Sequence, residues 1–300
     1  MRKVKIITDS CSDLTPELLE RYGIDYAKMN TVLDGETSPA RLEWTPEEVH
    51  AFYNLMRAGK RITTTQVPVE EFRTIFEKYL SEGYDIVYVA CCSKQSGSVN
   101  TARVVADRML PDYPGAAIYC IDALNSAMGE GLLSIVAAMF VEEGLSADEV
   151  AEKVTAMRKN VNEYITVHSL DALARSGRLK ASKAFIGNLM GVKPILTADY
   201  YGAQTPMKKV RGRQNSLHEI IALLKDSIEE TPKYPILFCH ADCQQDEVDE
   251  ILAMIREELP GREICVGYFG PIIGASIGPD AVGVFGIGRE VTFGKDAAEN

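Results

Sequence analysis

The chain has 300 residues, a length that suits two domains or one large one. Its 43 acidic residues outnumber its 32 basic residues, and the net charge of -11 argues against binding to nucleic acid or to an anionic membrane surface. The apolar fraction of 46% is ordinary for a globular protein with a full core, and no apolar run is long enough to cross a bilayer. We therefore expect a protein without stable membrane insertion and without a nucleic-acid partner.

The N-terminus and the cysteines indicate the compartment. The apolar stretch before Asp9 is too short for a signal peptide, and Asp9 interrupts it. The seven cysteines are odd in number and scattered, which fits buried thiols in a reducing environment better than a disulfide framework. Both features predict a cytoplasmic protein.

The first half of the chain alternates strand-like and helix-like segments. Apolar runs predict strands at Lys3 to Asp9, Tyr26 to Leu33, Asp85 to Ala90 and Ala116 to Asp122. Helices are predicted after the Thr-Pro-Glu starts at Thr15 and Thr45, and at Val69 to Leu80, Ser98 to Leu110 and Met128 to Glu143. This alternation implies right-handed crossovers and a parallel sheet.

The pattern changes after about residue 160. Strands are predicted at Tyr164 to Ser169, Tyr234 to Cys239, Glu263 to Phe269 and Ala281 to Ile287, with a hairpin of Lys193 to Thr197 and Gln204 to Val210. Helices are predicted at Ser182 to Met190, Ser216 to Glu229 and Gln245 to Leu259. We therefore predict a two-domain α/β protein. Residues 1–160 form an N-terminal Rossmann-like domain with a parallel sheet, and residues 161–300 form a C-terminal α/β domain with a mixed sheet.

Three polar clusters follow predicted strands or helices. They are Thr8 to Asp13, Thr63 to Gln66, and Ser93 to Ser98. Ligands of open α/β sheets sit at the carboxyl ends of the strands, and hydroxyls beside free helix N–H groups favour an anion. Turn and N-cap roles explain each cluster better when it is taken alone. Three clusters at one sheet edge make a binding site about as good an explanation.

Three other kinds of site find less support in the sequence. The four histidines, His50, His168, His218 and His240, do not stand near a nucleophile elbow, so nothing indicates a catalytic serine or cysteine. The soft ligands of Cys239 to Cys243 have no matching second pair, and a buried strand end explains them without a metal. No phosphate-binding glycine loop is present, and the late glycines up to Gly288 do not open a predicted helix.

Several stretches together resemble the DegV family. They are Thr8-Asp9-Ser10, Thr64-Thr65-Gln66 with Glu70-Glu71-Phe72, Ser93-Lys94-Gln95-Ser96-Gly97-Ser98, Met128-Gly129-Glu130-Gly131-Leu132, Leu173-Ala174-Arg175-Ser176-Gly177-Arg178-Leu179, Val192-Lys193-Pro194-Ile195-Leu196, Lys209-Val210-Arg211-Gly212, and Gly270-Pro271-Ile272-Ile273-Gly274-Ala275-Ser276-Ile277-Gly278-Pro279. Each piece is modest, but eight in register across residues 4–288 are specific.

The resemblance implies a protein that holds one long-chain fatty acid and catalyses nothing itself. The carboxylate is expected at the domain junction, at Thr64, Thr65, Ser96 and Ser276 with Arg178 nearby, and the acyl chain in a buried tunnel. No metal and no cofactor is expected besides the bound fatty acid. The resemblance also implies a separate kinase subunit as partner, which makes an acyl-phosphate for phospholipid synthesis.

The sequence departs from the family pattern at several positions of the predicted site. Ser276 stands where the family has His, and a serine cannot carry charge. Thr65, Val67, Ser98 and Ser176 replace the usual Ser, Pro, Thr and Gly. Most of these changes keep a hydroxyl or a small side chain.

Two hypotheses concern an apolar helix and Arg211, and two alternative functions stay open. The apolar side chains of Phe185, Ile186, Leu189 and Met190 line either the acyl tunnel or plain core. Arg211 falls where the kinase is expected to bind. One alternative is an enzyme for a small anionic substrate, with Ser96 or Asp9 as an active group. The other is a sensor of another amphiphilic ligand.

Overall fold

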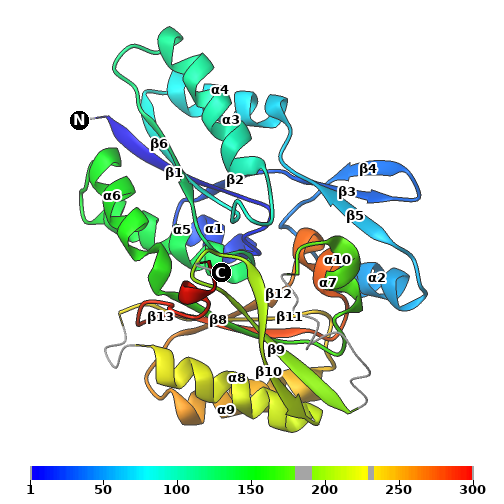
Figure 1. The fold of residues 1–300 in the computed structure, drawn as a ribbon. Coiled ribbons are helices and arrows are strands. Elements are labelled where there is room, and N and C mark those ends of the chain that lie inside the picture. The colour runs from blue at the N-terminus through cyan, green and yellow to red at the C-terminus, as the bar shows by residue number, and fades with distance from the viewer. Residues whose placement is uncertain (1, 180–190, 229–232, 299–300) are drawn as a thin grey trace.

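Two of the three β-sheets lie one above the other, with helices between them and on their outer faces, and the third, a small sheet of β3, β4 and β5, lies to one side (Figure 1). The computed structural model describes residues 2–179, 191–228 and 233–298. The predicted helix at Ser182 to Met190 lies outside the described residues. So does the hypothesis that its apolar side chains line the tunnel, which concerns Phe185, Ile186, Leu189 and Met190. None of the helices within the described ranges is long and apolar enough to span a bilayer.

Sheet A is the parallel sheet that the sequence predicts. Its strands run in the order β2-β1-β6-β7, where β1 is Lys3–Asp9, β2 Asp25–Ala27, β6 Tyr84–Ala90 and β7 Ile118–Asp122. All neighbouring pairs are parallel. The connecting helices are α1 Pro16–Arg21, α3 Val69–Ser81, α4 Ser98–Met109, α5 Ala127–Glu142 and α6 Ala147–Met157. Helices α3 and α4 cover one face, and α5 and α6 cover the other (Figure 1).

Sheet B shows that the prediction of a single strand from Tyr26 to Leu33 is wrong. The segment splits into β2 of sheet A and a separate strand β3, Asn30–Leu33. Strand β3 pairs antiparallel with β4, Glu36–Pro39, and with β5, Ile62–Thr65. The chain leaves sheet A between these strands because β3 pairs with a partner more than thirty residues later. The predicted turn at Asp34-Gly35 joins β3 to β4, with both residues at positive φ. Helix α2, Pro46–Arg57, follows and begins at the Thr45 cap as predicted.

Sheet C is mixed, as predicted for the second half of the chain. Its order is β10-β9-β8-β13-β11-β12, with β8 Val161–Thr166, β9 Val192–Ala198, β10 Gln204–Arg211, β11 Ile236–His240, β12 Ile264–Tyr268 and β13 Val282–Ile287. Only β11 and β12 pair in parallel. Helices α8, Arg213–Ser227, and α9, Gln245–Glu258, lie on its outer face (Figure 1). Two short helices that the sequence did not predict are α7, Asp171–Ser176, and α10, Pro271–Ile277. Single 3-10 turns occupy Leu110–Asp112, Arg158–Asn160 and Lys295–Ala298.

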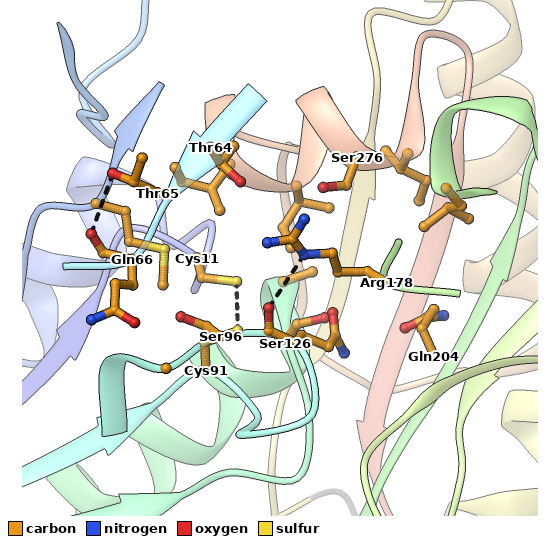
Figure 2. A pocket seen from close by; sticks show the side chains of 18 of the residues that line it. Cys11, Thr64, Thr65, Gln66, Cys91, Ser96, Ser126, Arg178, Gln204 and Ser276 are labelled. Carbon is orange, nitrogen blue, oxygen red and sulfur yellow. Dashed lines mark hydrogen bonds between the residues drawn. The ribbon is translucent and has the colours of Figure 1, made fainter. Parts of the chain in front are cut away.

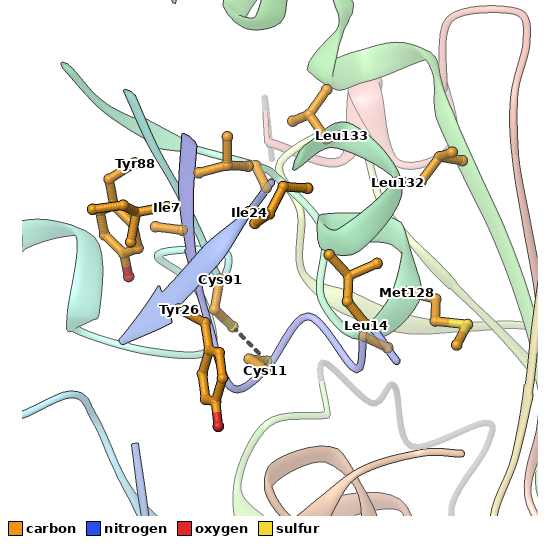
Figure 3. Close-up of a cluster of buried hydrophobic side chains, with 14 of the residues drawn as sticks. Ile7, Cys11, Leu14, Ile24, Tyr26, Tyr88, Cys91, Met128, Leu132 and Leu133 are labelled. Carbon is orange, nitrogen blue, oxygen red and sulfur yellow. Dashed lines mark hydrogen bonds between the residues drawn. The ribbon is translucent and has the colours of Figure 1, made fainter. Parts of the chain in front are cut away.

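Helix α5 lies between the two sheets and joins them into one core. It contacts β1 and β6 on one side and β8, β11 and β13 on the other, which explains why nearly every residue of the helix is buried. Figure 3 shows Leu132, Leu133 and Met128 of this helix beside Leu14, which follows β1. Gly131 permits the close approach, because a Cβ at this position would lie 2.7 Å from the Ser12 carbonyl oxygen.

Candidate ligand-binding cavity

A cavity of about 230 Å3 opens where the carboxyl ends of β1 and β6 meet strand β5, helix α10 and the inner face of sheet C (Figure 2). Its wall is formed by Cys11, Met29, Thr64, Thr65, Gln66, Cys91, Gln95, Ser96, Gly97, Ser126, Ala127, Ile165, Leu173, Arg178, Gln204, Ile272, Ile273, Ser276 and Ile277. These residues come from strands of sheets B and C, from helices α5, α7 and α10, and from the loops that follow β1 and β6 of sheet A. The lining combines apolar side chains with a few hydroxyls and amides, as is typical of small-molecule sites.

The structure brings all five predicted site residues to this one cavity, although their roles as ligand contacts stay predictions. Thr64, Thr65, Ser96, Arg178 and Ser276 all line it. The expected position of the second polar cluster is wrong, because Thr63 to Thr65 do not follow a strand of sheet A but form most of β5 in sheet B. Sheet B places β5 over the edge where the other two clusters end, so the three clusters still meet.

The Ser96 hydroxyl belongs to a chain of hydrogen bonds at the start of α4. The Val67 N–H donates to Ser98 Oγ over 3.2 Å, and the Ser98 N–H donates to Ser96 Oγ over 3.2 Å. The two hydroxyl oxygens lie 2.9 Å apart. Because the Ser98 hydroxyl is fully buried, its proton needs an acceptor, and Ser96 Oγ is placed to accept it. Ser96 is then free to donate to a ligand.

Thr65 differs from Ser96 because its hydroxyl is already engaged. Asn30 Nδ2 donates to Thr65 Oγ1 over 3.3 Å, and the Thr65 hydroxyl donates to the Gln66 carbonyl over 3.5 Å. Thr64 instead lies at the border of a second, outer cavity of about 520 Å3. Thr65 therefore shapes the wall, whereas Thr64 stands at the mouth.

Arg178 carries a positive charge at that mouth. It follows Gly177, whose φ of 71° is left-handed and ends α7. The guanidinium donates to the Gln95 carbonyl over 3.4 Å and to the Ser176 carbonyl, so the side chain bridges α7 and the loop after β6. The outer cavity shares Thr64, Arg178 and Ser276 with the inner one and adds the cations of Lys60, Arg61 and Arg175. This outer cavity is thus basic, within a chain of net charge -11.

Helix α10 carries Ser276. The sequence-based expectation that none of the late glycines begins a helix is wrong for Gly270. Gly270 is the N-cap of α10, and Pro271 is its first residue. The helix packs closely on α2, because a Cβ on Gly274 would lie 2.5 Å from the Tyr53 hydroxyl oxygen. That hydroxyl donates to the Phe269 carbonyl over 2.6 Å, and so fixes the chain just before α10.

Asp9, the second candidate active group of the enzyme alternative, has a structural role. Its carboxylate accepts hydrogen bonds from the Tyr88 hydroxyl at 2.7 Å, the Cys11 N–H at 2.9 Å and the Cys91 N–H at 3.2 Å. The side chain is fully buried and is not part of the cavity wall. It therefore ties together the ends of β1 and β6, and the structure does not place it beside a substrate.

Two thiols and one carboxyl beneath the cavity form a cluster that the sequence did not indicate. The Sγ atoms of Cys11 and Cys91 lie 3.1 Å apart (Figure 2), and one ligand atom from each thiol and from Glu130 lies within 4.8 Å of the others. Burial raises the pKa of the Cys11 thiol and of the Glu130 carboxyl well above their ordinary values. Both shifts favour the protonated forms, which opposes metal binding because metal ligands must be deprotonated.

The candidate metal ligands of Cys239 to Cys243 have other partners. The Cys243 N–H donates to His240 Nδ1 over 3.2 Å, and burial lowers the pKa of His240 to about 4. The Asp242 carboxylate lies 2.5 Å from Arg57 Nη1 and 3.0 Å from His50 Nδ1. The packing explanation from the sequence therefore accounts for these residues.

Several residues of the cavity wall were not predicted from the sequence. Gln66 and Gln95 belong to the polar clusters but were not singled out, although long amide side chains in such loops are a usable signal. Ile165 and Gln204 come from sheet C, and their strand patterns do not reveal which face meets sheet A. Arg211 ends the edge strand β10 and is not part of the cavity lining.

The fold and the cavity define an α/β protein of three sheets with a ligand-sized pocket between them. The chain belongs to the DegV family, since the family model described as "Uncharacterised protein, DegV family" matches residues 3–289. A DegV domain-containing protein of Clostridium perfringens is 33% identical over 290 residues, which are 96% of this chain and 98% of the relative. A fatty acid-binding protein of Thermotoga maritima is also 33% identical over 290 residues, covering 95% of this chain and 97% of the relative. The solved structure of DegV from Bacillus subtilis, described as a fatty acid binding protein, matches with a TM-score of 0.82 at 26% identity, over 96% of this chain and all of that one.

Proposed function

We propose that the protein binds one long-chain fatty acid in the cavity between its sheets and catalyses no reaction of its own. The observation that carries this proposal is one cavity wall that bears the hydroxyls of Thr64, Ser96 and Ser276 beside the Arg178 guanidinium. The fatty-acid-binding relatives support it, because the similarity spans nearly the whole chain.

In this proposal, the carboxylate lies at the border of the inner and outer cavities. A desolvated carboxylate needs several hydrogen-bond donors. The donors proposed here are the hydroxyls of Ser96, Thr64 and Ser276 and the guanidinium of Arg178. Thr65 supports the wall because its own hydroxyl is engaged with Asn30. The basic outer cavity favours an anionic head group over a neutral one.

The acyl chain supplies most of the affinity. Burying each methylene contributes roughly 0.8 kcal/mol, so a tail of about fifteen carbons contributes roughly 12 kcal/mol before entropy costs. The cavity lining of Ile165, Leu173, Ile272, Ile273 and Ile277 offers an apolar surface for it. The polar mouth then orients the ligand, and the tail holds it.

A separate kinase subunit is the proposed partner, as the DegV resemblance implies. A carboxylate at the mouth of the pocket lies beside the open, basic outer cavity, where a second protein can reach it. Arg211, at the end of the edge strand β10, is the proposed contact on the second half of the chain. We also propose that two domains, residues 1–160 and 161–300, meet at the cavity, because the strands of sheet C begin at Val161.

Native mass spectrometry of the purified protein, followed by denaturing extraction, tests the proposal. We expect one fatty acid per chain, and extraction identifies its chain length. An empty protein that also fails to take up added oleate or palmitate would overturn the proposal and favour the small-anion alternative.

A further inference from the structure

Two thiols meet in the wall of the ligand cavity, and fatty-acid binding alone gives them no role. Sγ of Cys11 lies 3.1 Å from Sγ of Cys91, and both residues line the cavity (Figure 2). Each residue is only 2% exposed, so a molecule reaches the two sulfur atoms through the cavity rather than from bulk solvent. The thiols are therefore a pair of reducing groups beside the space that the ligand occupies.

One carboxylate holds the backbones of both cysteines. Asp9 accepts the Cys11 N–H over 2.9 Å and the Cys91 N–H over 3.2 Å, at the ends of the neighbouring parallel strands β1 and β6. Because the two cysteines are 80 positions apart in the sequence, the fold and not the local chain brings them together. A further approach of about 1 Å brings the sulfur atoms to disulfide bonding distance. The pair is thus placed to change between a dithiol and a disulfide.

The protonation of the thiols decides which oxidants react with them. The hydrogen bond from Cys11 lowers the pKa of the Cys91 thiol, but burial and the nearby Glu130 and Asp9 carboxyls raise it more, to about 12. Burial raises the pKa of the Cys11 thiol well above its ordinary value. Because the thiolate is the attacking form, a dissolved oxidant reacts slowly near pH 7. An oxidant bound beside the sulfur offsets this, since well-oriented groups reach effective concentrations on the order of 10⁵ M.

We propose that Cys91 and Cys11 reduce a hydroperoxide group on the acyl chain of a bound fatty acid, once per protein molecule, and become a disulfide. This inference rests on the proposed fatty-acid function and names a subclass of its ligands, the fatty-acid hydroperoxides. The cavity that binds the acyl chain also carries the two sulfur atoms, so binding delivers the oxidant to them. The reaction is stoichiometric, so the protein remains a binding protein rather than a catalyst.

The atoms and electrons of this reaction balance without a further reactant. Cys91 attacks first, because the hydrogen bond from Cys11 stabilises its thiolate. Its sulfur bonds to the terminal oxygen of the hydroperoxide, the O–O bond breaks, and the oxygen left on the acyl chain takes the thiol proton and becomes a hydroxyl. Cys91 is then a sulfenic acid. The Cys11 sulfur attacks the Cys91 sulfur, the disulfide forms, and the hydroxide leaves as water with the Cys11 proton. The two thiols lose two electrons, and the hydroperoxide gains them.

A single-turnover reaction of the full-length protein tests the proposal. The delipidated, reduced protein is mixed with one equivalent of an octadecadienoic acid hydroperoxide, using isomers with the group at different carbons, or with hydrogen peroxide. Chromatography measures the hydroxy acid, and intact mass spectrometry measures the loss of two hydrogens from the protein. We expect one isomer to produce the Cys11–Cys91 disulfide at least roughly a hundredfold faster than hydrogen peroxide at the same concentration. Equal rates for the two oxidants would overturn delivery by the bound ligand.

Three single variants complete the test. Cys91→Ser, or Cys91→Ala if the first does not fold, should bind octadecanoic acid but form no hydroxy acid. Cys11→Ser should form one equivalent of hydroxy acid and leave Cys91 as a sulfenic acid, which dimedone traps. The control Cys92→Ser should react like the wild type, because Cys92 is also buried but is not part of the cavity wall.

Two kinds of failure can be told apart. A wild type that binds the hydroperoxides and keeps both thiols, or a Cys91 variant that still reduces them, would overturn the redox pair and leave fatty-acid binding intact. Failure to bind any of these acids would instead overturn the proposed function and the redox pair with it.

Discussion

The Ser98 N–H donates to Ser96 Oγ, and the two hydroxyl oxygens of this pair lie 2.9 Å apart at the start of α4. Ser98 is fully buried and Ser96 lines the cavity, so the inner serine orients the outer one. If the buried Ser98 hydroxyl donates to Ser96 Oγ, the Ser96 proton is available to a ligand in the cavity.

Replacing Ser96 with alanine should weaken fatty-acid binding roughly ten- to hundredfold, because a hydrogen bond to a charged group contributes about 1.5–3 kcal/mol. Displacement of a fluorescent fatty acid measures the change. Ser93→Ala is the matched control, since Ser93 belongs to the same loop but is exposed. Equal affinities for the two variants would remove Ser96 from the site. Binding that is retained together with lost turnover of a small anion would favour the enzyme alternative.

Replacing Arg178 with glutamine should weaken binding of the carboxylate and reduce its dependence on salt. The charge at the mouth attracts the anionic head group, and ions screen that attraction. Affinity for palmitate should fall in low salt, whereas affinity for its methyl ester should not change. Arg175→Gln is the comparison and should have a smaller effect, because Arg175 lines only the outer cavity. The role of Arg178 is refuted if the acid and the ester lose affinity equally.

The DegV resemblance implies a histidine at the position of Ser276, and introducing that residue should make binding depend on pH. Serine does not titrate near neutral pH, whereas histidine gains a proton near pH 6.5. The Ser276→His variant should therefore bind palmitate more tightly at pH 6 than at pH 8, by up to roughly fivefold for a partly exposed charge pair. Ser276→Ala should lower affinity without adding this step. A Ser276→His variant with the pH profile of the wild type would place residue 276 away from the carboxylate.

Local sequence signals predicted the elements that depend on local physics. The Thr-Pro-Glu starts at Thr15 and Thr45 begin α1 and α2 because cap, proline and acidic first turn act within a few residues. Strand β6 could be predicted because a strand buried on both faces is a nearly continuous apolar run.

The pairing of strands that are distant in the sequence could not be predicted from local patterns. Sheet B joins residues near Asn30 to residues near Thr65, and no local pattern reveals that pairing. Thr64 and Ser96 could be proposed from polar clusters, and Arg178 could be proposed as a counter-charge for a carboxylate, but its place at the site, and Ser276 altogether, came only from the family resemblance. Gln204 could not be proposed at all, because its position depends on which face of sheet C meets helix α5. Helix α10 is the avoidable miss, since Gly270 followed by Pro271 is a usable helix start.

His240 should make the protein less stable in mild acid. Burial lowers its pKa in the folded state to about 4, whereas an unfolded chain binds the proton near pH 6.5. The unfolded state therefore binds more protons between these values, so the free energy of unfolding falls as pH drops below 6.5, by about 1.4 kcal/mol per pH unit at most. Urea unfolding at pH 7 and pH 5.5 measures the slope. His240→Asn should be less stable than the wild type at pH 7 but should lose less stability between the two pH values, while the control His218→Asn, at an exposed position of α8, should keep the wild-type slope. Equal slopes for wild type and His240→Asn would show that another group causes any acid sensitivity.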